Sequence, residues 1–176
     1  MDRTCEIRAL HESDAVSYRD LRLFAHDESS EAFGTSLEEE QALSAEQFAA
    51  RLTANAEESV TLGLFVDGSL GGTVSIVRMS RVKMRHKAGL YGMYLRPELR
   101  GRGWGRRLFE EAIAAGRRMK GVEILQLSVV VDQAAARTLY HHLGFIPYGM
   151  ESRALRNGDR DLDEELLALE ISKRKS

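Results

Sequence analysis

Hydrophobic and polar residues along this chain change their period several times, and each change marks the border of a predicted element. Runs in which apolar residues alternate with polar ones indicate strands, and apolar residues that recur every three or four positions indicate helices. These patterns predict strands over residues 4–10, 60–66, 70–77, 88–96, 122–131, 145–155 and 162–171. They predict helices over residues 14–25, 106–119 and 134–143, and a further helix that begins after Ser44 and continues through Phe48 and Leu52.

Polar residues at the borders support this division. Asp67–Gly68 lies between two apolar runs, which is a strong hairpin signal, and Asn157–Gly158 repeats that signal near the end of the chain. Ser44 and Gln47 have the spacing of a helix capping box. Three consecutive acids, Glu38–Glu40, precede this helix, and we interpret them as a solvated helix start.

The order of the predicted elements indicates a fold class. The strand at 88–96, the helix at 106–119 and the strand at 122–131 form a βαβ unit, which joins parallel strands by a right-handed crossover. Residues 122–131 are nearly all apolar, as in a strand that is covered on both faces. The other strands form an antiparallel arrangement around this unit. We therefore expect an α/β fold with a mixed, mostly antiparallel twisted sheet and one central β-α-β crossover.

The composition limits the protein to a few classes. A length of 176 residues suits one domain, so we expect residues 1–176 to form a single domain. Hydrophobic residues make up 43% of the chain, and the net charge of −2 argues against a nucleic-acid-binding protein. Cys5 is the only cysteine, which excludes an intrachain disulfide, and no apolar run reaches membrane-spanning length. The expectation is a soluble cytoplasmic protein without a nucleic-acid or membrane partner.

Three glycines alternate with arginine and tryptophan over Arg100–Gly105, between the central strand and the central helix. A strand that turns into a helix here leaves backbone N–H groups without partners, and the helix dipole adds partial positive charge. Glycine lets the backbone close on a ligand, so the segment predicts an anion site, most often for a phosphate. The glycine spacing differs from the dinucleotide-binding fingerprint, and Arg106–Arg107 stands where a P-loop has Lys-Ser/Thr.

Two motifs carry a family resemblance. Arg100, Gly103 and Gly105 fill the pattern Arg/Gln-x-x-Gly-x-Gly/Ala. A second motif consists of Ala136, Leu139, Tyr140, Leu143, Gly144 and Phe145. The two motifs lie on either side of the strand at 122–131. In these motifs and in its order of elements, the chain resembles the GCN5-related N-acetyltransferase family. Its N-terminal part, with Leu21, Arg22 and the Glu31–Ser36 segment, resembles a bacterial branch of that family.

The resemblance implies transfer of an acetyl group from acetyl-coenzyme A (acetyl-CoA) to an amine. In the family, the strands that correspond to 88–96 and 122–131 splay apart, and the coenzyme lies between them. Its pantetheine amides pair with the first strand, in the manner of an added strand, and its pyrophosphate rests on the glycine-loop amides. The implied cofactor-binding residues are Met93, Tyr94, Leu95, Arg100, Gly101, Arg102, Gly103, Trp104, Gly105, Arg106 and Gln133. No metal is expected. The alternative for Arg102 is a solvated charge, and the alternative for Trp104 is a lid or packing residue.

The chemistry requires a group that protonates the leaving thiolate, and Tyr140 stands where the family has this acid. The alternative for Tyr140 is a core aromatic residue beneath the last helix. A backbone N–H near Met93 could stabilise the oxyanion. No Asp or Glu occurs between Met79 and Pro97, where some relatives carry the base. The base therefore lies elsewhere, or a water chain removes the proton, or the amine arrives already neutral. Glu31 is our candidate for a base elsewhere, with an exposed loop carboxylate as its alternative.

The sequence does not identify the acceptor amine. The acidic segment 28–40 would favour a cationic amine, and Tyr91 is a candidate for the wall of the acceptor pocket. The acceptor can be an amine of a small molecule or of a protein. The sequence does not determine the oligomeric state, and a homodimer is possible. Two other classes compete with the enzyme: a non-catalytic coenzyme A-binding sensor or interaction module of the same fold, and an unrelated nucleotide-binding α/β protein.

Overall fold

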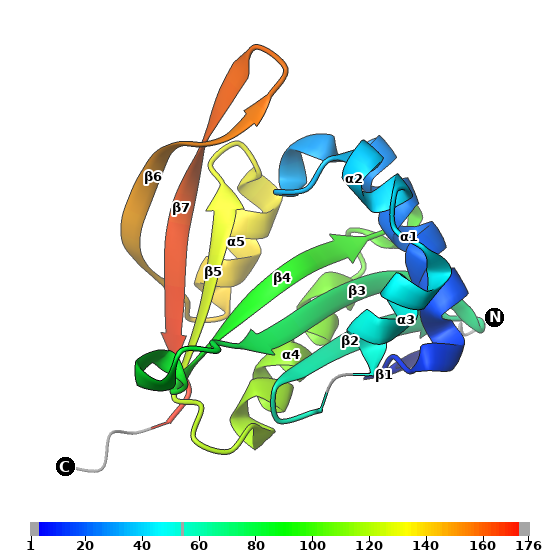
Figure 1. Ribbon diagram of the computed structural model, residues 1–176. Helices are drawn as coiled ribbons and strands as arrows, with labels where there is room; N and C mark the ends of the chain where they lie inside the picture. Colours follow the sequence, from blue (N-terminus) through cyan, green and yellow to red (C-terminus); the bar gives the residue numbers. More distant parts are fainter. Residues whose placement is uncertain (1–3, 54, 173–176) are drawn as a thin grey trace.

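A seven-stranded sheet runs through the computed structural model, which describes residues 4–53 and 55–172 (Figure 1). The strands are β1 Cys5–Ala9, β2 Ser59–Val66, β3 Ser69–Arg78, β4 Lys87–Leu95, β5 Ile124–Val130, β6 Ile146–Asn157 and β7 Arg160–Glu170. Their order across the sheet is β1-β2-β3-β4-β5-β7-β6. Only the β4–β5 pair is parallel among the described strands, and the others are antiparallel. The predicted mixed, mostly antiparallel α/β fold is confirmed.

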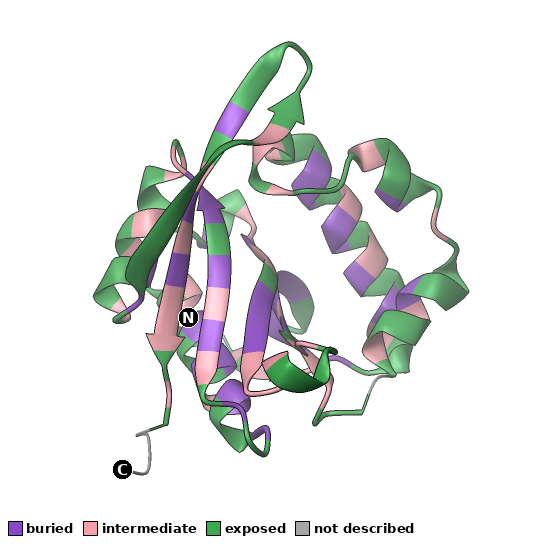
Figure 2. Cartoon of the chain, turned by 60° about the vertical axis from the view of Figure 1, so that its left-hand side comes forward, coloured by how far each residue is buried: buried purple, intermediate pink, exposed green. Residues whose placement is uncertain are grey.

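Helices cover both faces of this sheet. They are α1 Ala15–Glu28, α2 Leu37–Gln41, α3 Ala45–Leu52, α4 Trp104–Arg118 and α5 Ala134–His142. Buried residues of α4 and α5 form one cluster with β2–β5 and β7, and buried residues of α1 and α3 form a second one, which includes Phe65 and Tyr94. Figure 2 shows that the central strands are mostly buried, whereas the tip of the β6–β7 hairpin is exposed. None of the described helices is long and apolar enough to cross a membrane.

Local signals in the sequence predict most of the element borders. The Ser44 capping box forms, with the Gln47 N–H donating to Ser44 Oγ at 3.2 Å and the Ser44 N–H donating to Gln47 Oε1 at 2.8 Å. Asp67–Gly68 makes the β2–β3 turn with φ of 52° and 80°, the left-handed conformation that such hairpins require. The last hairpin turns after Asn157, and α4 begins two residues earlier than predicted.

The interpretation of Glu38–Glu40 as a solvated helix start is wrong for its last residue. The three acids belong to α2, a short helix that the sequence analysis missed and that a Ser36/Glu39 capping box opens. The Glu40 side chain is only 2% exposed because Arg22 and Arg51 pair with it from α1 and α3. A carboxylate can be buried here because two guanidiniums compensate for its lost hydration.

The two central strands separate after a short parallel contact. Residues 87–89 of β4 pair with 124–126 of β5, and beyond that point β5 continues its pairing with β7 instead (Figure 1). The register between β3 and β4 shifts between Thr73 and Ser75, and Gly92 takes a φ of +60° in the resulting bulge. A bulge bends its strand, so the outer half of β4 turns away from β5 and a gap opens between them.

Candidate functional site

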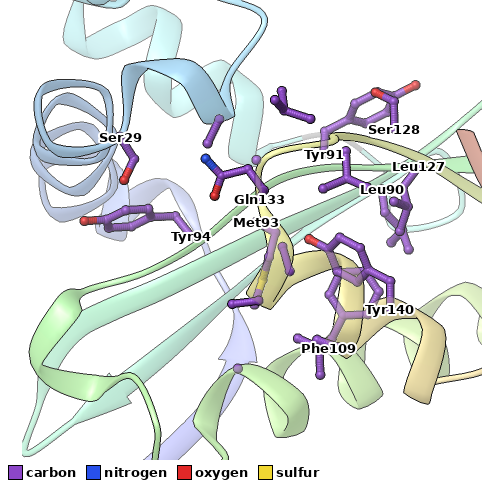
Figure 3. A pocket seen from close by; sticks show the side chains of 18 of the residues that line it. Ser29, Leu90, Tyr91, Met93, Tyr94, Phe109, Leu127, Ser128, Gln133 and Tyr140 are labelled. Carbon is purple, nitrogen blue, oxygen red and sulfur yellow. The ribbon is translucent and has the colours of Figure 1, made fainter. Parts of the chain in front are cut away.

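The gap between β4 and β5 holds a cavity of ≈ 390 Å³ that faces the start of α4 (Figure 3). Residues 90–95 of β4 form one wall, residues 127–130 of β5 form the other, and α5 closes it with Leu139 and Tyr140. Met93, Tyr94, Leu95, Arg100, Gly105, Gln133 and Tyr140 all line it. The structure thus brings together residues that the sequence analysis took from separate segments of the chain.

Backbone groups at the cavity edge of β4 have no strand partner in the described chain. The Arg96 N–H donates to the Gly71 carbonyl at 2.8 Å, so it points toward β3. Because orientation alternates along a strand, Met93 and Leu95 present their N–H and C=O groups to the opposite side, toward the cavity. The Leu95 carbonyl accepts a bond from Arg100 Nε at 2.9 Å, and no strand pairs with this edge beyond Gly89 in the described chain. A ligand with amide groups can therefore add to β4 as an extra strand.

The glycine loop presents a row of free donors at the N-terminus of α4. Within the described residues, the N–H groups of residues 101–106 have no acceptor, and the first one satisfied is that of Arg107, which donates to the Gly103 carbonyl at 3.1 Å. Gly101 and Gly103 have φ of +71° and +80°, and a Cβ on either would meet no atom within 4 Å. The space in front of the loop is open, so these amides and the helix dipole form a receptor for an anion.

The Arg100 guanidinium is held by protein groups. It donates to both carboxylate oxygens of Glu28, at 3.2 and 2.8 Å, and the Tyr94 hydroxyl donates to the same carboxylate at 2.9 Å. The Arg100 hydrogen bonds, with a smaller effect from Ser29, lower the pKa of Glu28 to about 2, whereas burial and the Glu28 carboxylate raise the pKa of Tyr94. The Arg100 N–H donates to Pro97. Arg100 thus fixes the loop to the end of α1, 72 residues away, a contact that no sequence signal indicates.

The other polar residues of the loop lie at the surface. Arg102 is exposed, and Arg106 pairs with Glu110 one turn along α4, at 2.8 Å. Trp104 packs against the core formed by α4 and α5, and Arg107 stacks on its ring at 5.0 Å. The Trp104 side chain is therefore engaged in packing, which was its alternative interpretation.

Tyr140 has features of both a core aromatic residue and a candidate acid. Its ring is buried against Phe109, with the ring centroids 4.7 Å apart, and near Phe145 at 6.3 Å. Its hydroxyl points into the cavity and has no hydrogen-bond partner among the described residues (Figure 3). Burial raises the pKa of the Tyr140 hydroxyl, which keeps the phenol protonated and able to donate.

The structure does not bring Glu31 into this cavity. Its carboxylate pairs with Arg160 at 3.1 Å, in a neighbouring groove. The acidic residue that does line the cavity is Glu164 of β7, which lies opposite Val130 and whose side chain has no ion pair or hydrogen bond in the described part of the chain. Sequence reasoning missed Glu164 because only the pairing of β7 with β5 places it there. Gln133 precedes α5 and turns its amide toward the cavity (Figure 3).

Comparisons with known proteins agree with this arrangement. The chain matches the model of the acetyltransferase (GNAT) family over residues 19–145. It is similar to an acetyltransferase of the GNAT family from Streptococcus pneumoniae, with 27% identity, a TM-score of 0.83, and coverage of 96% of this chain and 100% of that chain. No match was found among curated protein sequences.

Two further structures share the fold. One is yncA from Salmonella typhimurium, solved with its cofactor acetyl-CoA, at 20% identity, a TM-score of 0.85, and coverage of 100% of this chain and 98% of that one. The other is RimL, a ribosomal L7/L12 α-N-protein acetyltransferase in complex with coenzyme A, at 17% identity, a TM-score of 0.77, and coverage of 96% and 94%.

Proposed function

Because the chain belongs to the GNAT family of acetyltransferases, we propose that it is an acetyl-CoA-dependent N-acetyltransferase and that residues 1–176 form one such domain. It transfers acetyl directly from the thioester to a primary amine of a small molecule or a protein. The observation that carries this proposal is the row of unpaired N–H groups at residues 101–106, beside the open edge of β4.

These residues fit the two polar parts of the coenzyme. The loop amides match a diphosphate, since anions bind at helix N-termini where several N–H groups are free. The β4 edge at Met93 and Leu95 matches the amides of pantetheine, and the Gln133 side chain offers a further amide at the cavity wall. The coenzyme supplies an activated acetyl group when it is bound there.

The residues of the cavity can then act on the proton transfers of the reaction. As the amine attacks the acetyl carbonyl, a backbone N–H near Met93 stabilises the negative charge on the carbonyl oxygen. The C–S bond breaks, and the Tyr140 hydroxyl gives its proton to the leaving sulfur. The amine loses a proton, for which Glu164 is the carboxylate in the cavity wall.

Binding and turnover of acetyl-CoA test this function. We expect acetyl-CoA to raise the melting temperature and ATP and NAD to have no comparable effect. We expect a thiol-release assay over a panel of amines to show turnover. Gly103→Val should weaken acetyl-CoA binding, because Gly103 has a φ of +80° and a side chain would fill the open space in front of the loop. Stabilisation by ATP alone would refute the proposal, and binding without thiol release would leave a non-catalytic coenzyme A-binding module.

The assignment of the base can be tested with two matched variants. Glu164→Gln should lower kcat/KM by about 10²-fold or more, as expected for loss of a general base. Glu31→Gln should have little effect, since Glu31 lies outside the cavity and pairs with Arg160. The reverse order of effects would restore Glu31 as the base and would exclude Glu164.

A further inference from the structure

A second cavity of ≈ 540 Å³ lies beside the first and has no role in the steps described above. It is bounded by α1, α3 and the β2–β4 part of the sheet, and it shares Gly34, Tyr91 and Gly92 with the cavity between β4 and β5. A molecule in this second cavity would meet the acetyl group at the bulge of β4. Its volume is in the range of small-molecule sites.

One buried arginine of its wall has incomplete hydrogen bonding. The Arg22 side chain is 8% exposed, and its Nη2 is 3.3 Å from Glu40 Oε1 and 3.0 Å from His26 Nε2. Its Nε is buried without a partner, and Nη1 has no acceptor among the described residues. Nη1 lies beside Gly92, where a Cβ would come within 2.9 Å of it. The guanidinium therefore has donor capacity left at the border between the two cavities.

The charges around Arg22 do not balance. Burial opposes ionisation of Glu40, but Arg22 and Arg51 outweigh it and lower the pKa of this carboxyl group. Burial, and then Arg22, lower the pKa of His26, so its imidazole is neutral and accepts from Arg22. Glu39 accepts from the Ser36 N–H to cap α2. Two guanidiniums thus face one carboxylate. Arg51 keeps 39% of its side chain exposed to solvent, so the incompletely compensated charge that is buried is that of Arg22, at 8% exposure.

Three of the five acids of segment 28–40 are already paired with arginines. Arg100 holds Glu28, Arg160 holds Glu31, and Glu40 is held by the arginines of the second cavity. The sequence-based expectation that this segment attracts a cationic amine therefore has no free carboxylate among these three to rely on.

We infer that the second cavity binds the acceptor through a carboxylate that the acceptor carries close to its amine, as a free α-amino acid does, with Arg22 as the anion-binding residue. This inference rests on the proposed acetyltransferase function. The acceptor carboxylate completes the hydrogen bonding of Arg22 and neutralises the excess charge. Thr61 and Ser75, whose hydroxyls are 2.8 Å apart, add a polar wall, and the amine enters the cleft past Tyr91 and Gly92.

Pairs of compounds that differ only in the carboxylate test the inference. Binding of N-acetyl amino acids and of their amides to the coenzyme A-saturated protein would be measured by calorimetry, which requires no turnover. Amino acids and amino acid amides would be compared as acceptors by thiol release. We expect the acids to bind at least about tenfold more tightly than the amides, the typical effect of a charge-assisted hydrogen bond.

The double variant Arg22→Met/Glu40→Gln removes the anion site without leaving Glu40 as an unpaired carboxylate. It should abolish the preference for acids by raising their KM to that of the amides. Arg22→Lys, which keeps the charge, should retain part of the preference, and Arg81→Gln, at an exposed arginine outside both cavities, should retain all of it.

Equal binding of acids and amides by the wild type would overturn the inference, whether or not the double variant folds. A preference for acids that survives in a folded double variant, or faster turnover of polyamines than of amino acids, would also overturn it. Calorimetry with acetyl-CoA on the same samples separates the two proposals. Absence of acetyl-CoA binding refutes the transferase itself, whereas turnover of amines without a preference for acids refutes only the anion site.

Discussion

The two ends of the Tyr140 side chain lie in different surroundings. The ring contributes to the core beside Phe109 and Phe145, while the hydroxyl faces the cavity without a protein partner. Loss of the hydroxyl alone therefore breaks no hydrogen bond within the described protein. The structural and the catalytic contributions of this residue can be separated by a change of one atom.

Tyr140→Phe should lower kcat by about 10²- to 10⁴-fold, the range for loss of a general acid. The free energy of unfolding should change by less than about 1 kcal/mol, since no net hydrogen bond is lost. Thiol release and urea unfolding measure the two effects, and Tyr148→Phe, at an exposed tyrosine of β6, is the control. Unchanged turnover in the Tyr140 variant would show that another group protonates the thiolate.

Residues whose role depends on their neighbours in the sequence can be predicted from it. Gly103 and Ser44 are such cases, because a left-handed turn and a helix cap are set within a few positions. The partners of Glu40 and Arg100 cannot be predicted in this way, since α1, α3 and the glycine loop meet only in the folded sheet. One signal for α2 was present in the sequence, because Ser36 and Glu39 have the spacing of a capping box.

At the scale of elements, the bulge in β4 is the feature on which both cavities depend. Gly92 lines both of them, and its left-handed φ allows the strand to bend away from β5. The missing side chain also leaves room for the Arg22 guanidinium. The sequence shows only that a glycine lies inside a strand pattern. Glycine is required at this position because Arg22 of α1 occupies the space of a side chain.

A comparison of Gly92→Ala with Gly158→Ala separates the cost of backbone strain from the cost of displacing the Arg22 guanidinium. Both glycines have a φ near +60°, but a Cβ at Gly158 meets no atom within 4 Å. Gly158→Ala should cost roughly 1–2 kcal/mol of unfolding free energy through the left-handed conformation alone. Gly92→Ala should cost more, because its Cβ would displace Arg22, and it should also raise the KM for the acceptor. The losses of stability are measured by urea unfolding. Equal losses in the two variants would show that Arg22 can be displaced without an energetic cost.

The contact between the end of α1 and the glycine loop makes stability depend on pH. The ordinary pKa of Glu28 is 4.5, and Arg100 lowers it to about 2 in the folded protein. A depressed carboxyl pKa stabilises the fold above the unfolded value, and this contribution is lost as the pH falls from about 4.5 toward 2.

Glu28→Gln should therefore lower the melting temperature at pH 7, and the difference from the wild type should shrink between pH 4.5 and 2. Thermal unfolding over this range measures it. Glu110→Gln, which removes an exposed pair within α4, is the control and should have a small effect. A difference that stays constant with pH would show that the Glu28 carboxylate is not stabilised by Arg100.

At the scale of the whole molecule, the cofactor cleft is a consequence of strand pairing. β4 belongs to the antiparallel group β1–β4, and β5 pairs with β7 along its length. In the described chain the two groups pair as strands only at residues 87–89 and 124–126, while the core cluster around α4 and α5 contains buried residues of both groups and joins them below the opening. A ligand that bridges the opening should therefore stabilise the molecule as a whole.

Hydrogen exchange with and without acetyl-CoA tests this coupling. Amides of residues 101–106 lack acceptors in the described protein and should exchange rapidly until acetyl-CoA protects them. The amides of Arg100 and Arg107 already donate to Pro97 and Gly103, so their protection should change less. Core amides of both groups of strands should gain equal protection, about 2.7 kcal/mol at a ligand concentration of a hundred times Kd. Protection limited to β1–β4 would mean that the coenzyme binds to one side of the opening and does not bridge the two groups.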